Sequence, residues 1–385
     1  MPIPSLVPED LTTPGTHALV IGVSRYRHLA DGGTPTAVGT EFELEQLSAA
    51  ARSASEFAGW LLEHYRNPDA PLRSLRVLLS PSPGEQLAPA VATRIANVRS
   101  ATLKEVEEAA QQFTQAANTH RDNVAIVYVA GHGVQLTKAG AVVLLEDFGA
   151  DGLPTKLRAG LDVGGLHTSM RSNTSARTQF WFVDACRQRT QVARKFESLA
   201  LPQQFDVPLG DADVSPLFLA ATTGKPAYAR PGGRTLFGES LLWALDGGAA
   251  TSPEENGIDA WHVSVTSLIQ KLPTRVRALA QAENAEQSVD VAGRVLEAVF
   301  HQFAGAPQAD LQVDLAPPEA QPKARATLKL DDVVVLLDHA DWPLKRRVDA
   351  GLYRLDIAAD APYVARQKVL NIKPPAYSAN IKVTP

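Results

Sequence analysis

One imidazole and one thiol follow two strongly apolar segments of this chain, and a cysteine nucleophile with its base requires these two groups. His132 follows the uncharged stretch 124–130, and Cys186 follows the apolar stretch 179–183. Uncharged runs rich in β-branched and aromatic residues predict strands buried on both faces, as in a parallel sheet covered by helices. Because open α/β sheets place their ligands beyond the carboxyl ends of the strands, we expect both groups at one edge of the sheet.

Cys186 is the only cysteine in the 385 residues, so it cannot form an internal disulfide. A single cysteine after an apolar strand is often a small buried hydrophobic residue. Caspase-type peptidases, however, carry Gln-Ala-Cys-(Arg/Gln/Gly)-Gly about 50 residues after a histidine. Here Asp184-Ala185-Cys186-Arg187-Gln188 places the cysteine 54 residues after His132. In these motifs and their order, the chain resembles the caspase-like family, which includes metacaspases and paracaspases.

Further landmarks extend the resemblance over roughly residues 15–300. Residues 17–26 resemble the first strand of the family with its following turn, and residues 47–62 resemble its first helix. Residues 215–222 and 235–242 resemble the first strand of the small subunit and the helix after it. The resemblance implies an α/β fold with a central, mostly parallel sheet and helices on both faces.

The composition changes near the C-terminus and predicts a second domain. We expect a peptidase domain over residues 1–305, with a large-subunit-like part at about 15–195 and a small-subunit-like part at about 214–305. The Pro-rich stretch 306–322 suits a linker. Short alternating segments with turn residues between them predict a small all-β sandwich over residues 323–385. This tail is typical of an accessory or docking module.

The resemblance implies a Cys-His dyad that hydrolyses peptide bonds. A cysteine thiol is mostly protonated at neutral pH, so His132 would remove its proton for attack on a carbonyl carbon. The implied donors to the oxyanion are the backbone N–H groups of Gly133 and Cys186. Glycine on both sides of the histidine allows a close approach of the backbone to a substrate. Without the cysteine, this Gly-His-Gly would indicate a tight turn with an exposed histidine.

Asp184 is the candidate for the pocket that binds the residue before the scissile bond (P1). Caspases have Gln two residues before the nucleophile, whereas metacaspases and paracaspases have Asp and accept Arg or Lys. A buried carboxylate pairs best with a guanidinium or ammonium group, which favours cleavage after a basic residue; alternatively, Asp184 only caps the strand end. The chain differs from the family at two positions. Relatives with basic preference commonly carry an Asp where this chain has Ser53, and paracaspases carry a Glu where it has Ala229.

Other acids could replace these two in the pocket. The candidates in the long loop after the first strand are Asp31, Glu41, Glu43 and Glu45. Acids in a loop are usually solvated, so the pocket is expected to hold one acid unless one of these four enters it.

The long segment 187–214 joins the nucleophile strand to the next predicted strand and is the candidate region for proteolytic activation. Nicking concentrates in exposed connections of this kind. Arg189, Arg194 and Lys195 are the candidate processing sites, cut by the enzyme itself or by an upstream activating protease. The alternative is a solvated basic loop without a processing role. The resemblance to small prokaryotic caspase-like proteases suggests a bacterial defence or cell-death pathway.

Composition and charge limit the remaining classes of partner. The chain has 45% hydrophobic residues, 21% charged residues and a net charge of −5, and it has no basic tract for nucleic acid. Residues 1–10 do not form a signal peptide, and no uncharged stretch is long enough to cross a bilayer, so we expect a cytoplasmic protein. The histidines lack zinc-ligand spacing, and no loop has calcium-ligand spacing, so we expect neither metal nor cofactor. The expected partners are protein substrates.

A second class of function remains open at this stage. The caspase-like domain could be catalytically silent and act as a scaffold that docks partners through the β tail. Because both His132 and Cys186 are present, the peptidase is favoured over the silent scaffold. Labelling of Cys186 by a thiol-directed peptide probe, with loss of labelling in His132→Ala, discriminates between the two.

Overall fold

The computed structural model describes residues 2–37, 44–135, 141–151, 158–173, 176–187, 213–230, 232–253 and 258–385. The chain forms two compact units. The first comprises Met1–Leu242 and Ser264–Gln302, and the second comprises Trp243–Val263 and Phe303–Pro385. His132 and Cys186 both belong to the first unit.

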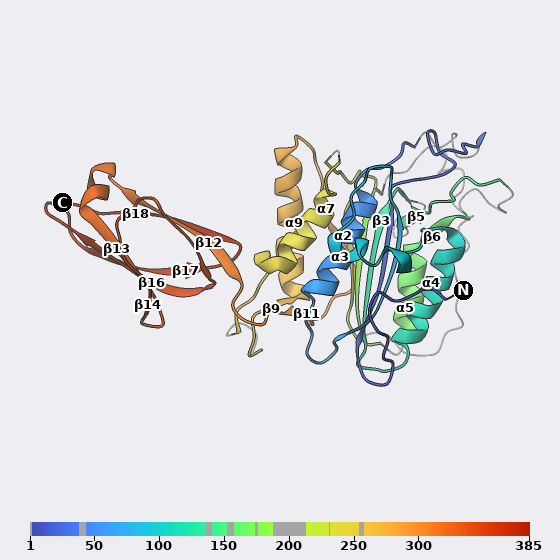
Figure 1. Ribbon diagram of the computed structural model, residues 1–385, viewed down its shortest axis with the longest axis horizontal. Helices are drawn as coiled ribbons and strands as arrows, with labels where there is room; N and C mark the ends of the chain where they lie inside the picture. Colours follow the sequence, from blue (N-terminus) through green and yellow to red (C-terminus); the bar gives the residue numbers. More distant parts are fainter. Residues whose placement is uncertain are drawn as a thin grey trace. The chain divides into compact units, whose positions relative to one another are not determined.

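A six-stranded sheet forms the centre of the first unit (Figure 1). Its strands, in spatial order, are β10 (Asp290–Arg294), β8 (Ser215–Leu219), β7 (Thr178–Ala185), β3 (Val124–Gly131), β1 (Thr16–Val23) and β2 (Leu72–Ser80). Neighbouring strands from β8 to β2 are parallel, and β10 is antiparallel to β8. The two apolar stretches that precede the histidine and the cysteine form β3 and β7, and β3 is buried at every position. The predicted α/β fold with a mostly parallel sheet is confirmed.

Helices cover both faces of this sheet. They are α2 (Ala50–Glu63), α3 (Pro89–Ala92), α4 (Leu103–Ala117), α5 (Val163–Asn173), α7 (Leu236–Trp243) and α9 (Val265–Ala282). Figure 1 shows α2, α7 and α9 on one face and α4 and α5 on the other. Among the described residues, no helix is both long and apolar enough to cross a membrane.

The start of α2 is fixed by two polar side chains from neighbouring segments. The Ala51 N–H donates to Ser24 Oγ (2.9 Å), and the Arg52 N–H donates to Glu85 Oε1 (2.8 Å). These acceptors satisfy N–H groups that the helix itself leaves free. The helix begins three residues later than the sequence predicted, because the Leu47 N–H is still bound to the Ser24 carbonyl (2.8 Å) in the extended segment before it.

Shorter elements complete the list for the two units. An antiparallel sheet of β4 (Gly133–Gln135), β5 (Ala141–Leu144) and β6 (Gly160–Asp162) begins directly after His132. The remaining short elements are β9 (His262–Ser264), β11 (Val299–Gln302), η1 (Ile95–Asn97) and η2 (Ala244–Gly248).

Two sheets of the second unit form the predicted β-sandwich around one apolar core. One sheet contains β15 (Leu344–Asp349), β12 (Gln308–Ala316) and β18 (Ala376–Lys382). The other contains β14 (Val333–His339), β13 (Ala324–Leu330), β16 (Gly351–Ala359) and β17 (Arg366–Ile372). All pairings in it are antiparallel except that of β12 with β18, which is parallel.

The expected linker over residues 306–322 is wrong, because β12 occupies most of it. Leu311, Val313 and Leu315 alternate with polar residues, and all three side chains are buried in the sandwich core. The prolines that follow form a short turn of 3₁₀ helix, η3 (Pro318–Lys323), rather than a connector. Apolar and polar residues alternate in this stretch with the period of a strand. The prolines on either side of it favoured a linker instead, and the strand was therefore missed.

Arg187, directly after the nucleophile candidate, is a buried structural residue. Its guanidinium pairs with Asp290 of β10 (2.8 Å), and its side chain is only 3% exposed. Its backbone N–H and carbonyl bond to Lys225 and Gly224, respectively. The chain is therefore fixed to the end of the sheet immediately after Cys186.

We expect Asp290→Asn to lower the free energy of unfolding by about 1–3 kcal/mol, because it leaves a buried guanidinium without its charged partner. Chemical denaturation measures this loss. Glu286→Gln breaks the exposed Lys225–Glu286 pair and is the matched control, with an expected change below about 0.5 kcal/mol. Equal effects of the two substitutions would show that the Arg187–Asp290 pair does not stabilise the sheet.

Candidate functional site

His132 and Cys186 leave neighbouring strands at the same edge of the sheet. Strands β3 and β7 pair in register over their full lengths, and the last pair is Gly131 with Ala185. His132 and Cys186 are each the next residue of their strand. The parallel pairing thus brings the two groups to one edge, although 54 residues separate them in sequence.

The backbone and imidazole of His132 are held by two groups that the sequence analysis did not single out. The His132 N–H donates to the Tyr26 hydroxyl (2.7 Å), and the two rings lie 5.0 Å apart between centroids. Nε2 lies 2.7 Å from the Glu45 carbonyl oxygen. Since a carbonyl can only accept, Nε2 carries the proton, and Nδ1 is the basic nitrogen of the neutral ring. Burial lowers the pKa of His132, which favours this neutral form.

The Cys186 thiol is half-buried and contacts the loop between β8 and α7 (residues 220–235, described except for residue 231). The Ala227 N–H donates to Sγ (3.2 Å), and the thiol donates to the Ala227 carbonyl (3.5 Å). Burial raises the pKa of the thiol, and the charge of Asp184 adds to this rise. No hydrogen bond joins Cys186 to His132 among the described residues. The thiol therefore stays protonated at neutral pH and needs a base to react.

Gly133 packs directly against the nucleophile residue. A Cβ atom at this position would lie 2.0 Å from the Cys186 carbonyl oxygen and 2.9 Å from Cβ of Ala185. Only glycine permits this approach. The backbones of Gly133 and Cys186, whose N–H groups are the candidate oxyanion donors, are therefore in close contact.

Asp184 is buried below this edge, with 3% of its surface exposed. Its Oδ2 accepts from the Tyr128 hydroxyl (2.7 Å) and from the Thr235 hydroxyl. Its Oδ1 is also buried and has no hydrogen-bond partner within the described ranges. Burial raises the pKa of the carboxyl group to about 6, although the two hydroxyls and the Gly238 N–H oppose the rise. Above this pH the chain holds a buried carboxylate with one unpaired oxygen.

Ser53 and Thr235 join Asp184 to helix α2. The Ser53 Oγ accepts the Thr235 N–H (2.9 Å), and the two hydroxyls bond to each other (3.1 Å). Ser53, where the sequence analysis expects a second acid in the relatives, thus contributes a hydroxyl to the network around Asp184. Ala229, the other expected departure, lies on the exposed surface of the loop.

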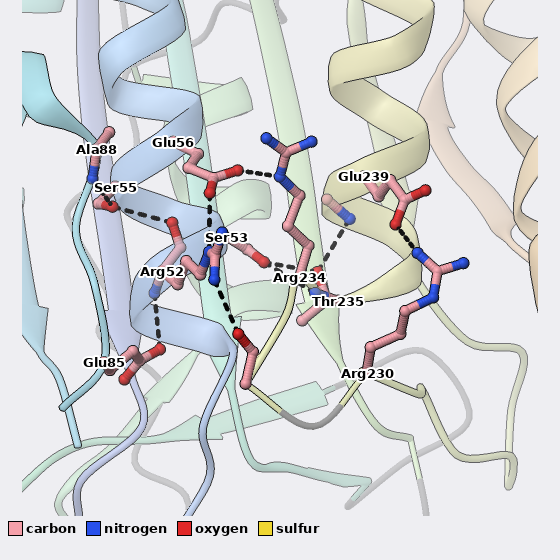
Figure 2. Close-up of polar contacts among 12 residues, drawn as sticks. Arg52, Ser53, Ser55, Glu56, Glu85, Ala88, Arg230, Arg234, Thr235 and Glu239 are labelled. Atoms are coloured by element: carbon pink, nitrogen blue, oxygen red, sulfur yellow. Dashed lines mark hydrogen bonds and ion pairs between the residues drawn. The ribbon is translucent and has the colours of Figure 1, made fainter. Parts of the chain in front are cut away.

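Ion pairs fasten the same loop to the helices around it (Figure 2). Arg230 pairs with Glu239 of α7 and with Glu283 (2.7 Å). Arg234 pairs with Glu56 of α2. Single exposed ion pairs contribute little, but together these contacts fix the loop that supplies both Ala227 and Thr235.

Arg52 of α2 adds a further contact to this arrangement. Its guanidinium pairs with Glu56 (2.9 Å; Figure 2). It also donates to the Gly232 carbonyl (2.8 Å). The loop beside the thiol is therefore bound to α2 at a backbone atom as well as through side chains.

Several residues considered in the sequence fall elsewhere. The candidate processing sites Arg189, Arg194 and Lys195 lie outside the described residues, as do Glu41 and Glu43. Asp31 and the side chain of Glu45 are exposed. No group of three or more His, Cys, Asp or Glu side chains in the described part of the chain could hold a metal ion.

Comparison with known proteins identifies the family. The model of the caspase domain, peptidase family C14, matches residues 16–293, so the chain belongs to this family of cysteine peptidases. Among solved structures, caspase-1 from Spodoptera frugiperda is similar at 11% sequence identity, over 79% of this chain and 97% of that chain, with a TM-score of 0.41. No curated protein matches the sequence.

We expect Gly133→Ala to displace the Cys186 backbone, because the new methyl group meets a carbonyl oxygen at 2.0 Å. The alkylation rate of Cys186 in the native protein should change by about threefold or more, with a loss of roughly 1–3 kcal/mol in stability. Alkylation by iodoacetamide and thermal unfolding measure the two effects. The urea-unfolded variant should react at the wild-type rate, and an unchanged native rate would contradict the close packing.

Proposed function

We propose that this chain is a cysteine endopeptidase in which His132 and Cys186 form the catalytic dyad. The observation that supports it most is the arrangement at the edge of β3 and β7, where a thiol and a neutral imidazole of defined tautomer end neighbouring strands. Membership of the caspase-domain family supports the same conclusion. Substrates of such an enzyme are proteins or peptides.

The proposed reaction uses both groups in two stages. When a substrate displaces the thiol from the Ala227 carbonyl, His132 Nδ1 accepts the Sγ proton, and the thiolate attacks the scissile carbonyl carbon. The Gly133 and Cys186 N–H groups stabilise the oxyanion. The amine leaves with the proton from His132, and a water molecule activated by the same imidazole hydrolyses the thioester.

We expect Cys186→Ala and His132→Ala each to lower kcat/KM for peptide hydrolysis by at least ~100-fold, because each removes a reacting group. A panel of fluorogenic peptides measures this. His64→Ala is the control, since this side chain is exposed, and it should leave the activity unchanged. Activity of either dyad variant within about tenfold of wild type would contradict the assignment. Failure of Cys186 to react with a peptide probe would favour the alternative scaffold function.

Cleavage after Arg or Lys is the proposed specificity, and Asp184 is its basis. A cationic P1 side chain would supply a partner of opposite charge for the buried carboxylate, whose Oδ1 has no hydrogen-bond partner among the described residues. The Ser53 and Thr235 hydroxyls orient Asp184 in place of a second acid. The proposed P1 site therefore uses one acidic side chain, Asp184, which the Tyr128 and Thr235 hydroxyls bind.

We expect Asp184→Asn to lower kcat/KM for Arg peptides at pH 7.5 by about tenfold or more, while Cys186 alkylation stays within about twofold of wild type. In the wild type, kcat/KM should fall as the pH drops through about 6, because Asp184 then gains a proton and loses its charge. Peptide libraries and pH profiles measure both effects. Cleavage after Asp or apolar residues would overturn the pocket assignment without affecting that of the nucleophile.

Activation by cleavage at Arg189, Arg194 or Lys195, by the enzyme itself or by an upstream protease, remains a proposal from the sequence. So does a role in a bacterial defence or cell-death pathway. Arg187 is a poor site for such a cut, because it is buried and paired with Asp290. The β-sandwich is proposed as an accessory module that takes no part in the chemistry.

A further inference from the structure

Tyr26 connects the ends of two strands at the candidate site. Its side chain is fully buried, and its hydroxyl accepts the His132 N–H (2.7 Å) while it donates to the Val23 carbonyl at the end of β1 (3.3 Å). Its ring lies against the imidazole at an angle of 40°. One side chain thus holds both the backbone and one face of His132.

Gln46 joins this tyrosine to the segment that holds the other end of the imidazole. Its Oε1 accepts the Tyr26 N–H (2.7 Å), and its Nε2 donates to the carbonyl oxygens of Tyr26 and Ala30 (both 2.9 Å). The residue before it, Glu45, provides the carbonyl that accepts from His132 Nε2. The Gln46 side-chain amide therefore fixes the distance between Tyr26 and the Glu45 carbonyl, the two groups that hold the imidazole.

The surroundings leave little room for a different arrangement. A Cβ atom on Gly131 would lie 2.9 Å from the Tyr26 hydroxyl, so this position needs glycine to let the phenol reach His132. Burial and the nearby Cys186 raise the pKa of Tyr26, so the hydroxyl stays protonated and can act as donor and acceptor at once.

We propose that Tyr26 and Gln46 are positioning residues that hold the His132 imidazole with Nε2 bound to the Glu45 carbonyl and Nδ1 available to the Cys186 thiol. This inference rests on the proposed dyad. In this arrangement the Tyr26 phenol, the Gln46 side-chain amide and the Glu45 backbone carbonyl together hold the imidazole of the dyad.

Tyr26→Phe tests the first support. At neutral pH, the rate constant for Cys186 alkylation by iodoacetamide should fall by about threefold to tenfold, the range expected for one lost hydrogen bond. At high pH, where the thiol ionises without a base, the rate should equal that of wild type. kcat for peptide hydrolysis should fall with KM unchanged. Tyr65→Phe is the matched control, since it removes another tyrosine hydroxyl, half-buried and bonded to Thr16 in β1, away from His132.

Gln46→Met tests the side-chain amide that links Tyr26 to the Glu45 segment. It also covers the case in which Tyr26→Phe does not fold. It keeps the length of the side chain and removes its three hydrogen bonds to the Tyr26 and Ala30 backbones. The same loss of alkylation rate, confined to neutral pH, is expected. Gln321→Met, which removes one amide–carbonyl bond in the β-sandwich, should have no effect.

The outcomes separate this inference from the proposed function. If wild type hydrolyses peptides and both variants alkylate at the wild-type rate across the pH range, the positioning role is overturned and the peptidase stands. If wild type hydrolyses no peptide but both variants and His132→Ala slow alkylation at neutral pH, the positioning role stands and the proposed function fails. A rate reduced equally at all pH values would indicate a general structural defect and would also overturn the inference.

Discussion

The parallel pairing of β3 with β7 is the constraint on which the site depends. Two chemically complementary groups lie next to each other because each directly follows the last paired residue of its strand, and no side-chain contact is needed to bring them together. Everything else at the site adjusts this arrangement: Tyr26 and the Glu45 carbonyl orient the imidazole, and Ala227 engages the thiol. A one-residue slip of either strand would turn the side chains of that strand to the other face of the sheet and would separate the two groups.

Burial determines the protonation states at this edge. It makes charge costly for the imidazole, the thiol and the Asp184 carboxyl alike, so His132 and Cys186 favour their neutral forms and Asp184 ionises only near neutral pH. A resting site of this kind holds few charges. In the proposed mechanism, ionisation of the thiol therefore depends on a proton transfer to His132 that accompanies substrate binding, rather than on a preformed ion pair.

The sequence predicted the elements and the order of the motifs, and it did so best where apolar runs were long. The strands before His132 and Cys186 could be placed from composition alone, because buried parallel strands have few alternatives. It missed β12, whose short alternation lay between prolines. It also missed the Glu45 carbonyl, since any residue type offers a carbonyl and only the path of the backbone brings one to Nε2. Tyr26 ends the segment 17–26 that resembles the family's first strand and turn, but nothing in its spacing indicated a contact with His132.

The parallel pairing of β12 with β18 has a consequence for the synthesis of the chain. These are the first and last strands of the sandwich, so β12, the central strand of one sheet, lacks a neighbour until β18 is available. While the nascent chain is still attached to the ribosome, Leu311, Val313 and Leu315 have an open strand edge beside them. The sandwich can close only after β18 has been synthesised, so the edge of β12 stays open to pairing with other chains for as long as the segments between the two strands are being made.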